Sequence, residues 1–312
     1  MSYKIKDAKS LVTTKKLVRK GFIDFANKRN DILKDYINEA KLISKKIDKI
    51  KTSKELEKKI GNVLIDAAGL SVKSRKFFNN EDIKAFTQNF LKQFKSKKIL
   101  DIKDDIIFRY LLTKGDALGG KMRNVVGNLA EEKFKLCLID NLKNSTYKKK
   151  IVLKSNKIIE DFDGIHETKS IKFIIWKDNE KLRSMAFNLN VPITNKNIDI
   201  VIFNKDVSEI LQNFEEFKKN SKNYLCLGEL KGGIDPAGAD EHWKTASTSL
   251  FRIRNSFQKK NNIVNTFFVG AAIEENMSKE IFALYKNNAK FNCSNLNNNI
   301  QLNELIKWII KL

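Results

Sequence analysis

The sequence is poor in cysteine and has no long hydrophobic run. Its three cysteines, Cys137, Cys226 and Cys293, lie far apart along 312 residues. They therefore provide neither a disulfide framework nor the close pairs that are typical of a zinc site. No apolar run approaches the roughly 20 residues that span a bilayer, and the start, MSYKIKDAKS, does not lead into the apolar core of a signal peptide. These absences predict a cytoplasmic protein and argue against a membrane as its partner.

Positive charge is what the composition has in excess. The chain contains 60 Lys and Arg residues against 37 Asp and Glu residues, which gives a formal net charge of +23 at pH 7 with histidine neutral. Such an excess concentrates polyanions around a protein, so nucleic acid is the leading partner. An AT-rich genome can produce part of this lysine bias, so the positions of the charges matter more than their sum. The hydrophobic content of 42% can fill a buried core and argues against wholesale disorder.

The first part of the chain has the periodicity of helices. Thr52 and Glu55 have the spacing of a capping box and precede an apolar stripe that stops at Gly69. Apolar residues recur every three or four positions in two more segments, and this pattern predicts amphipathic helices whose apolar faces form a core. The members of these stripes are Val18, Phe22, Phe25, Ile32, Leu33 and Tyr36, and then Ile83, Phe86, Phe90 and Phe94. We predict a helical region over residues 1–113 and a second domain over 114–312.

Glycines mark the predicted boundary between these two parts. Gly115, Gly119 and Gly120 lie close together, and we interpret them as a loop that feeds a helix over residues 122–138. The segment is not a P-loop, because no Gly-Lys-Ser/Thr follows at the required spacing. The lysine run at 148–150 predicts a solvated loop.

Short strand-like segments dominate the rest of the chain. Buried-strand compositions occur at residues 171–176, 198–203, 224–231 and 266–272. The segment 239–257 has a helical pattern, and an Asn-rich segment at 292–299 predicts a loop before a short helix at 302–310. This alternation predicts an α/β fold with a mixed sheet that helices cover on both faces.

Three charged residues interrupt or end the predicted strands. Asp199 lies among Ile, Val and Phe, where an unpaired charge is costly, so it needs a cation or a place at the mouth of the sheet. Glu229 and Lys231 are two residues apart, which places them on the same side of a strand. Taken separately, they can be a strand-end residue and a surface ion pair. Together they match phosphodiester hydrolysis, in which two carboxylates hold Mg²⁺ and a lysine orients water or stabilises negative charge.

The run that follows Glu229 is much more specific. Residues 228–245 read GELKGGIDPAGADEHWKT. This run resembles the AvaI/BsoBI family of type II restriction endonucleases, and GDALGGKMRN at 115–124 also resembles segments of type II restriction enzymes. The resemblance implies a PD-(D/E)xK core that works as a homodimer, with a helical part that helps to enclose the DNA duplex.

The resemblance also implies the catalytic positions. It assigns them to Asp199, Glu229 and Lys231, with the two carboxylates as Mg²⁺ ligands. The proline of the PD pattern is missing, because Asn197-Ile198 precedes the aspartate. Asp206 and Asp178 therefore compete with Asp199 for its role, although the first follows the strand and the second precedes a charged loop.

Further residues near the site follow from the same resemblance. His242 corresponds to a family histidine near the active site, where it can orient the attacking water, help to deprotonate it or contact a phosphate. Its alternative is a packing or helix-capping residue. Glu131 or Glu132, on the predicted helix after the glycines, is either an accessory carboxylate or part of a solvated helix face.

Three residues are candidates for DNA contacts. Asp235 follows two glycines and precedes Pro236, and the resemblance carries a base-contacting aspartate onto it. Such a carboxylate accepts a hydrogen bond from cytosine N4 in the major groove. The alternative is a turn aspartate that caps the next helix. Lys73 and Arg19 are candidates for reading guanine or for positioning phosphates.

The expected function is Mg²⁺-dependent double-strand cleavage of unmethylated DNA at a specific site, with water attacking in line to leave 5′-phosphate and 3′-hydroxyl ends. The resemblance implies a CYCGRG-like palindrome, a bacterial setting and a cognate methyltransferase as functional companion. Two alternatives stay open. One is another PD-(D/E)xK nuclease, for repair, nicking or recombination, and the other is a DNA-binding protein without catalysis.

Overall fold

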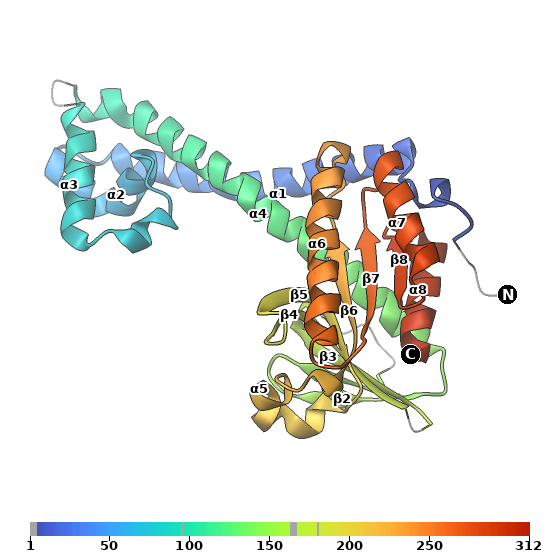
Figure 1. The fold of residues 1–312 in the computed structure, drawn as a ribbon. Helices are drawn as coiled ribbons and strands as arrows, with labels where there is room; N and C mark the ends of the chain where they lie inside the picture. The colour runs from blue at the N-terminus through green and yellow to red at the C-terminus, as the bar shows by residue number, and fades with distance from the viewer. Residues whose placement is uncertain (1–4, 95–96, 163–166, 180) are drawn as a thin grey trace. The chain divides into compact units, whose positions relative to one another are not determined.

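The chain divides into two compact units in the computed structural model, which describes residues 5–94, 97–162, 167–179 and 181–312. One unit is Ile23–Val125, and the other combines residues up to Phe22 with Val126–Leu312. Both boundaries fall inside helices, α1 (Lys15–Ile47) and α4 (Ile99–Lys143), which can be followed in Figure 1. The predicted division after residue 113 falls within α4 and stays a prediction.

The helical unit contains α2 (Ser53–Ala67), the 3₁₀ helix η2 (Ser74–Phe77) and α3 (Asn80–Lys92), together with parts of α1 and α4. Thr52 caps α2 by accepting a hydrogen bond from the Glu55 N–H at 3.2 Å. Glu55 in turn accepts from the Lys51 N–H at 3.1 Å. The helix stops before Gly69, which has a φ of +93°. The predicted start and stop of this helix are therefore confirmed.

The predicted apolar stripes are buried only in part. Phe90 and Phe94 lie in the core of the helical unit, with their rings edge to face at 5.3 Å. Phe86 is 37% exposed and Phe22 is 44% exposed, so the prediction that they form core is wrong. In α1 the buried residues are confined to its C-terminal part, from Ala40 onward. Periodicity predicts which side of a helix is apolar, but not how far neighbouring elements cover it.

The predicted loop at residues 115–120 is wrong, because α4 continues through it without a break. Apart from the neighbouring backbone of α4, a Cβ at Gly115, Gly119 or Gly120 would meet no atom of the described residues within 4 Å, so no close packing seen there requires these glycines. An interior glycine costs a helix only about 0.5–1 kcal/mol relative to alanine. The helix has 45 residues and is packed at both ends, and this packing outweighs the cost of the glycines.

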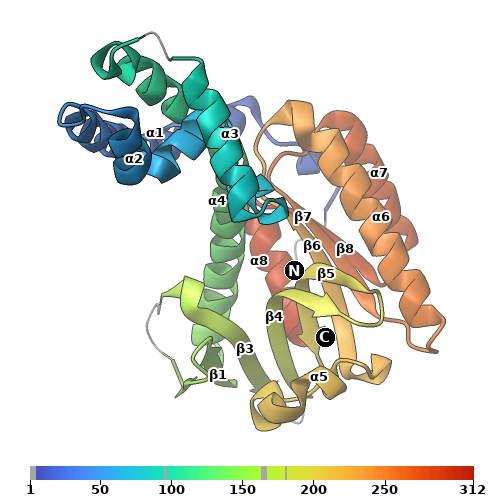
Figure 2. The same ribbon diagram turned by 90° about the vertical axis from the view of Figure 1, so that its left-hand side faces the viewer.

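The second unit is built on an eight-stranded sheet with the order β2-β1-β3-β4-β5-β6-β7-β8. Figure 2 labels these strands except β2, which is labelled in Figure 1. Its strands are β1 (Lys148–Leu153), β2 (Ile158–Glu160), β3 (Ile171–Asp178), β4 (Lys181–Val191), β5 (Lys196–Phe203), β6 (Tyr224–Lys231), β7 (Asn265–Gly270) and β8 (Phe291–Asn295). Neighbours are antiparallel up to β6, whereas β6, β7 and β8 run parallel. The mixed sheet is therefore confirmed.

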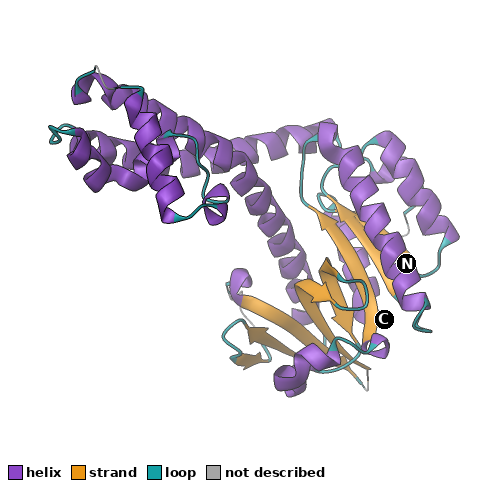
Figure 3. Ribbon diagram, turned by 60° about the vertical axis from the view of Figure 1, so that its left-hand side comes forward, coloured by secondary structure: helices purple, strands orange, loops and turns teal. Residues whose placement is uncertain are grey.

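Helices pack on both faces of this sheet, as predicted, and Figure 3 shows them on either side of the strands. One face carries α6 (Ala239–Gln258) and α7 (Glu275–Asn287), and the other carries α8 (Asn299–Lys311) with the C-terminal part of α4. Shorter helical turns are η1 (Lys9–Leu11), η3 (Thr168–Ser170), η4 (Val207–Asn213), α5 (Phe214–Phe217), η5 (Ser221–Asn223) and η6 (Pro236–Gly238). Within the described ranges, no helix has both the length and the apolarity that crossing a membrane requires.

Two predicted loops in this unit are wrong. The lysine run at 148–150 forms the first half of β1, where Lys150 pairs with Asp206 at 2.6 Å and so needs no bulk solvent to satisfy its charge. The Asn-rich segment at 292–299 is a turn only at residues 296–298, and its other residues lie in β8 and at the start of α8. Its Asn295 is buried and donates to the Leu11 carbonyl at 2.9 Å. Polar composition indicated a loop, but contacts with distant residues satisfy these side chains inside the fold.

Candidate active site

The ends of β5 and β6 bring the two predicted carboxylates together. The strands are antiparallel, and their backbone pairing reaches Ile200 opposite Gly228, so Asp199 and Glu229 occupy the next positions. Beyond that pair a side chain continues the contact between the strands, because the Leu230 N–H donates to Asp199 Oδ2 at 2.8 Å. The charged side chain that interrupts β5, Asp199, thus accepts a backbone hydrogen bond at this end of the sheet.

Lys231 joins these two carboxylates. Its Nζ lies 2.7 Å from Glu229 Oε2 and 3.0 Å from Asp199 Oδ2, and it donates to both. Lys231 reaches Glu229 because residues two apart on a strand project from the same side. The predicted trio is therefore a compact cluster with one shared ammonium group.

Burial decides the electrostatics of this cluster. The Glu229 side chain is 5% exposed, whereas that of Asp199 is 34% exposed. Burial raises the pKa of the Glu229 carboxyl above its usual value, although the charge of Lys231 opposes the shift. Burial alone would lower the pKa of Lys231, but the negative charges of Glu229 and Asp199 outweigh it, so this pKa is raised. Lys231 is therefore a cation at neutral pH.

A fourth residue, Ser249, was not predicted as a site residue from the sequence. Its Oγ donates to Glu229 Oε1 at 2.6 Å, so each oxygen of the Glu229 carboxylate has its own donor. Ser249 lies on α6, seven residues after His242, which places the two on the same side of this helix. That spacing from a predicted site residue is visible in the sequence, but it does not show that Ser249 faces Glu229.

The two glycines after β6 allow helices to approach the end of this strand. A Cβ on Gly232 would lie 2.7 Å from the Val126 carbonyl oxygen of α4, and one on Gly233 would overlap the His242 imidazole. The imidazole thus packs directly on the backbone that follows Lys231. In the part of the chain that the structure describes, His242 makes no hydrogen bond or ion pair, and its chemical role stays a prediction.

The two glutamates considered as accessory carboxylates have other partners. Glu131 forms an ion pair with Lys135 at 2.6 Å, and Glu132 accepts from Thr168 Oγ1 at 3.0 Å. Lys135 is almost fully buried and also lies over the Phe187 ring at 4.4 Å. Over the described ranges, no three His, Cys, Asp or Glu side chains come close enough to hold a metal together. The structure therefore gives neither glutamate a place beside Asp199 and Glu229.

The predicted DNA-contacting residues are all exposed. Asp235 Oδ1 accepts from the Ala237 N–H at 3.0 Å and caps η6, as the turn alternative predicts, but the side chain remains open to solvent. Arg19 lies on α1 in the sheet-containing unit. Lys73 precedes η2 in the helical unit. Their contacts with DNA stay predictions.

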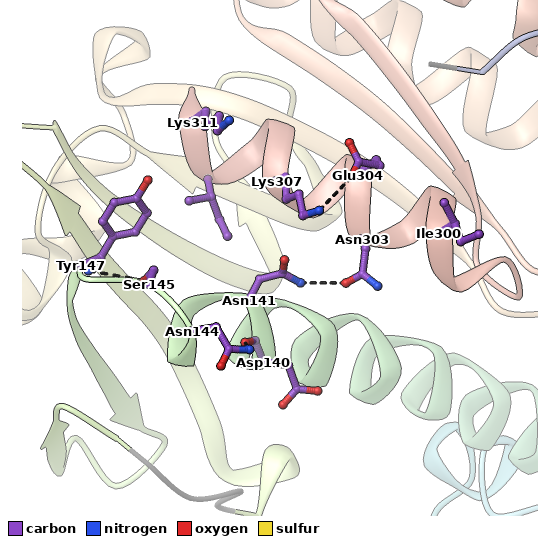
Figure 4. Close-up of a pocket in the computed structure, with 11 residues that line it drawn as sticks. Asp140, Asn141, Asn144, Ser145, Tyr147, Ile300, Asn303, Glu304, Lys307 and Lys311 are labelled. Atoms are coloured by element: carbon purple, nitrogen blue, oxygen red, sulfur yellow. Dashed lines mark hydrogen bonds and ion pairs between the residues drawn. The ribbon is translucent and has the colours of Figure 1, made fainter. Parts of the chain in front are cut away.

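A separate hollow of about 640 Å³ lies between the end of α4 and α8, as Figure 4 shows. Asn141 Nδ2 donates to Asn303 Oδ1 at 2.8 Å across it, and Lys307 pairs with Glu304 at 2.9 Å. None of the predicted site residues lines this hollow. Because α8 and α6 pack on opposite faces of the sheet, the hollow is distinct from the cluster around Lys231.

Comparisons with known proteins show the family of this chain. The family model described as "Restriction endonuclease BsobI" matches residues 1–312. Type II restriction enzyme BsoBI of Geobacillus stearothermophilus is 38% identical over 318 residues, covering 99% of this chain and 97% of the relative. The type II restriction enzymes AvaI of Nostoc sp. and of Anabaena variabilis are each 36% identical, with 99% of both chains covered. The likeness thus extends from end to end, and the chain belongs to the BsobI family of restriction endonucleases.

Proposed function

We propose that this protein is a type II restriction endonuclease that cuts both strands of unmethylated DNA at a specific sequence in a Mg²⁺-dependent reaction. The observation that carries the proposal is the convergence of Asp199 and Glu229 on Lys231 Nζ, at 3.0 and 2.7 Å. A full-length match to type II restriction enzymes supports it. Neither the charge total nor the fold alone distinguishes this activity from DNA binding.

The carboxylate oxygens of the cluster are suitable ligands for Mg²⁺. This ion prefers hard oxygen ligands in octahedral geometry and is commonly held by one or two carboxylates with several waters. Asp199 and Glu229 are such a pair. Asp199 uses Oδ2 for its two protein donors, and no hydrogen bond to Oδ1 occurs among the described residues. Bound there, Mg²⁺ would polarise the scissile phosphate and lower the pKa of a coordinated water.

Lys231 acts as a donor in this proposal. Because its pKa is raised, it stays protonated at neutral pH and cannot accept a proton from water. Its ammonium can instead hold the attacking water or stabilise the negative charge that develops on the phosphate. We assign to His242 the role of taking up a proton from the attacking water; its imidazole makes no hydrogen bond within the described residues.

Sequence choice and assembly are also proposals. We assign base contact to Asp235, whose exposed carboxylate has an oxygen to offer beyond its bond to Ala237. Lys73 and Arg19 would meet guanine or phosphates, and the helical region would help to enclose the duplex. One cluster per chain and two antiparallel strands to cut favour a homodimer acting on a palindrome of the CYCGRG type. A cognate methyltransferase would protect the host DNA.

Digestion of an unmethylated, sequenced phage genome tests this function directly. We expect discrete fragments in Mg²⁺ and none in EDTA, and mapping of the ends should return one palindrome with 5′-phosphate termini. A smear or nicked circles would instead indicate a nuclease without strict sequence choice. Unchanged DNA after prolonged incubation would favour a binding protein without catalysis.

A further inference from the structure

We infer that Ser249 is a positioning residue for the candidate metal ligand Glu229, and that it sets the orientation in which this carboxylate meets the metal. The inference rests on the proposed function and deepens it, because it assigns to α6 a part in the metal site. The observation behind it is the 2.6 Å hydrogen bond from Ser249 Oγ to Glu229 Oε1.

The position of Ser249 is fixed by the packing of α6. Trp243, Ala246 and Leu250 form part of a buried stripe that holds this helix on the sheet. Trp243 Nε1 also donates to Glu280 Oε2 of α7 at 2.7 Å, which ties the two helices together. Ser249 directly precedes Leu250 and therefore lies at the edge of this stripe, where its hydroxyl reaches β6. The donor is carried by a rigid element, as a positioning role requires.

The hydrogen bond of Ser249 is not the one that a helical serine makes by default. A serine inside a helix commonly donates to the carbonyl four residues earlier. Here the hydroxyl donates to a carboxylate 20 residues earlier in the sequence, on another element.

Ser249 and Lys231 together define the plane of the Glu229 carboxylate. Lys231 donates to Oε2 and Ser249 to Oε1, so both oxygens are held. Asp199 has a comparable pair of donors, the Leu230 N–H and the same lysine. Both carboxylates thus share Lys231 as a hydrogen-bond donor, and each has a second donor of its own, the Leu230 N–H for Asp199 and Ser249 for Glu229. Loss of the Ser249 hydroxyl would let the Glu229 carboxylate rotate about its contact with Lys231.

The expected consequence is weaker metal binding with DNA affinity preserved. Removal of a partner that orients a metal ligand costs about 10–100-fold in metal affinity or activity. Ser249→Ala should therefore raise the Mg²⁺ concentration for half-maximal single-turnover cleavage by a factor in this range. Ser249→Thr keeps a hydroxyl at the same position and should retain most of the metal affinity of the wild type.

The test compares wild type, Ser249→Ala and Ser249→Thr with a matched control, Ser247→Ala. Ser247 is half-buried on the same helix, but two residues correspond to about 200° around its axis, so it points elsewhere. Four measurements are made on each protein. Mn²⁺ binding to the protein–DNA complex is measured by electron paramagnetic resonance, and single-turnover cleavage is measured across a Mg²⁺ series. DNA affinity and the melting temperature are measured in EDTA.

The inference predicts that Ser249→Ala loses about 10–100-fold in Mn²⁺ affinity, with DNA affinity in EDTA unchanged, while Ser249→Thr and Ser247→Ala resemble wild type. Wild-type Mn²⁺ affinity in Ser249→Ala would overturn it. A loss explained by the unfolded fraction in the melting curve would overturn it as well. If wild type cuts no DNA, the proposed function fails, and the Mn²⁺ measurement still decides the role of Ser249.

Discussion

Replacing Lys231 with methionine removes the cation that Asp199 and Glu229 share while keeping a side chain of similar length. We expect this change to destabilise the sheet-containing unit at neutral pH, in addition to abolishing cleavage. Glu229 is nearly buried and would keep Ser249 as its remaining donor. Asp199 is about one third exposed and would keep the Leu230 N–H. The two carboxylates would then repel each other without compensation.

The magnitude follows from the contacts that are lost. A hydrogen bond to a charged group contributes about 1.5–3 kcal/mol net, and we count the one to Glu229 in full. The contact with Asp199 is discounted to at most about 1 kcal/mol because solvent screens it. The sum is a loss of about 1.5–4 kcal/mol. For a unit of this size, 1 kcal/mol shifts the melting temperature by about 2–4 °C, so a drop of about 3–16 °C is expected.

The pH dependence of this loss has a definite sign. Without Lys231, the pKa of Glu229, which burial already raises, rises further. An acid with a raised pKa in the folded state destabilises the fold as pH increases from its usual value near 4.5 through the raised value. The difference in melting temperature between wild type and Lys231→Met should therefore grow from pH 5 to pH 8.

Scanning calorimetry in EDTA at both pH values measures this effect. Lys244→Met is the matched control, because Lys244 pairs with Asp240 on α6 at 2.5 Å with both side chains largely exposed. Its melting temperature should equal that of wild type. A Lys231→Met protein as stable as wild type, or a difference that shrinks towards pH 8, would refute the reasoning.

Three further predictions concern DNA and alkaline pH. Asp235→Asn should lose about 1–3 kcal/mol of discrimination at a G·C pair, with the metal requirement unchanged. Competition binding with DNA variants that differ at single base pairs measures this loss. Equal weakening for all DNA variants would show that Asp235 only caps the turn. The logarithm of DNA affinity should fall with the logarithm of salt concentration by about 0.9 per phosphate contact, and a flat dependence would make the +23 net charge irrelevant to binding. Above pH 10.5, wild type should lose stability more steeply than Lys231→Met, because the raised pKa of Lys231 contributes stability that disappears as the lysine deprotonates; parallel alkaline melting curves would contradict this.

The strands that carry the site could be predicted because their composition conflicts with their charges. A run of Ile, Val and Phe indicates a buried strand, so Asp199 within it stands out, and the pair at 229 and 231 stands out in the same way. The fold then adds what composition cannot supply, namely that β5 and β6 are neighbours. The convergence of the three side chains depends on that pairing.

Elements with polar composition were harder to predict. The strand β8 reads FNCSN, yet Ser294 and Asn295 are buried in it. Asn295 Nδ2 donates to Thr13 Oγ1 at 2.8 Å, and these residues are 282 positions apart. No local pattern reports a partner at that distance. The prediction for residues 115–120 is wrong for the opposite reason. The local rule that clustered glycines indicate a loop is outweighed by the packing of the long helix α4.

Ser249 illustrates a third limit of sequence analysis. A serine within a helix has no charge and no conspicuous neighbours, and its role depends on which residue lies opposite. The seven-residue spacing from His242 becomes informative only when β6 is known to pack beneath α6. Positioning residues of this kind require the structure.

The most direct test of the account is the single-turnover cleavage rate of Glu229→Gln on its own recognition site, with DNA affinity measured in parallel. The account predicts a loss of more than about 100-fold in rate, exceeding the 10–100-fold typical of outer partners, while the affinity for the same DNA stays within a few-fold of wild type. Cleavage at the wild-type rate would show that the cluster of Asp199, Glu229 and Lys231 is not the active site.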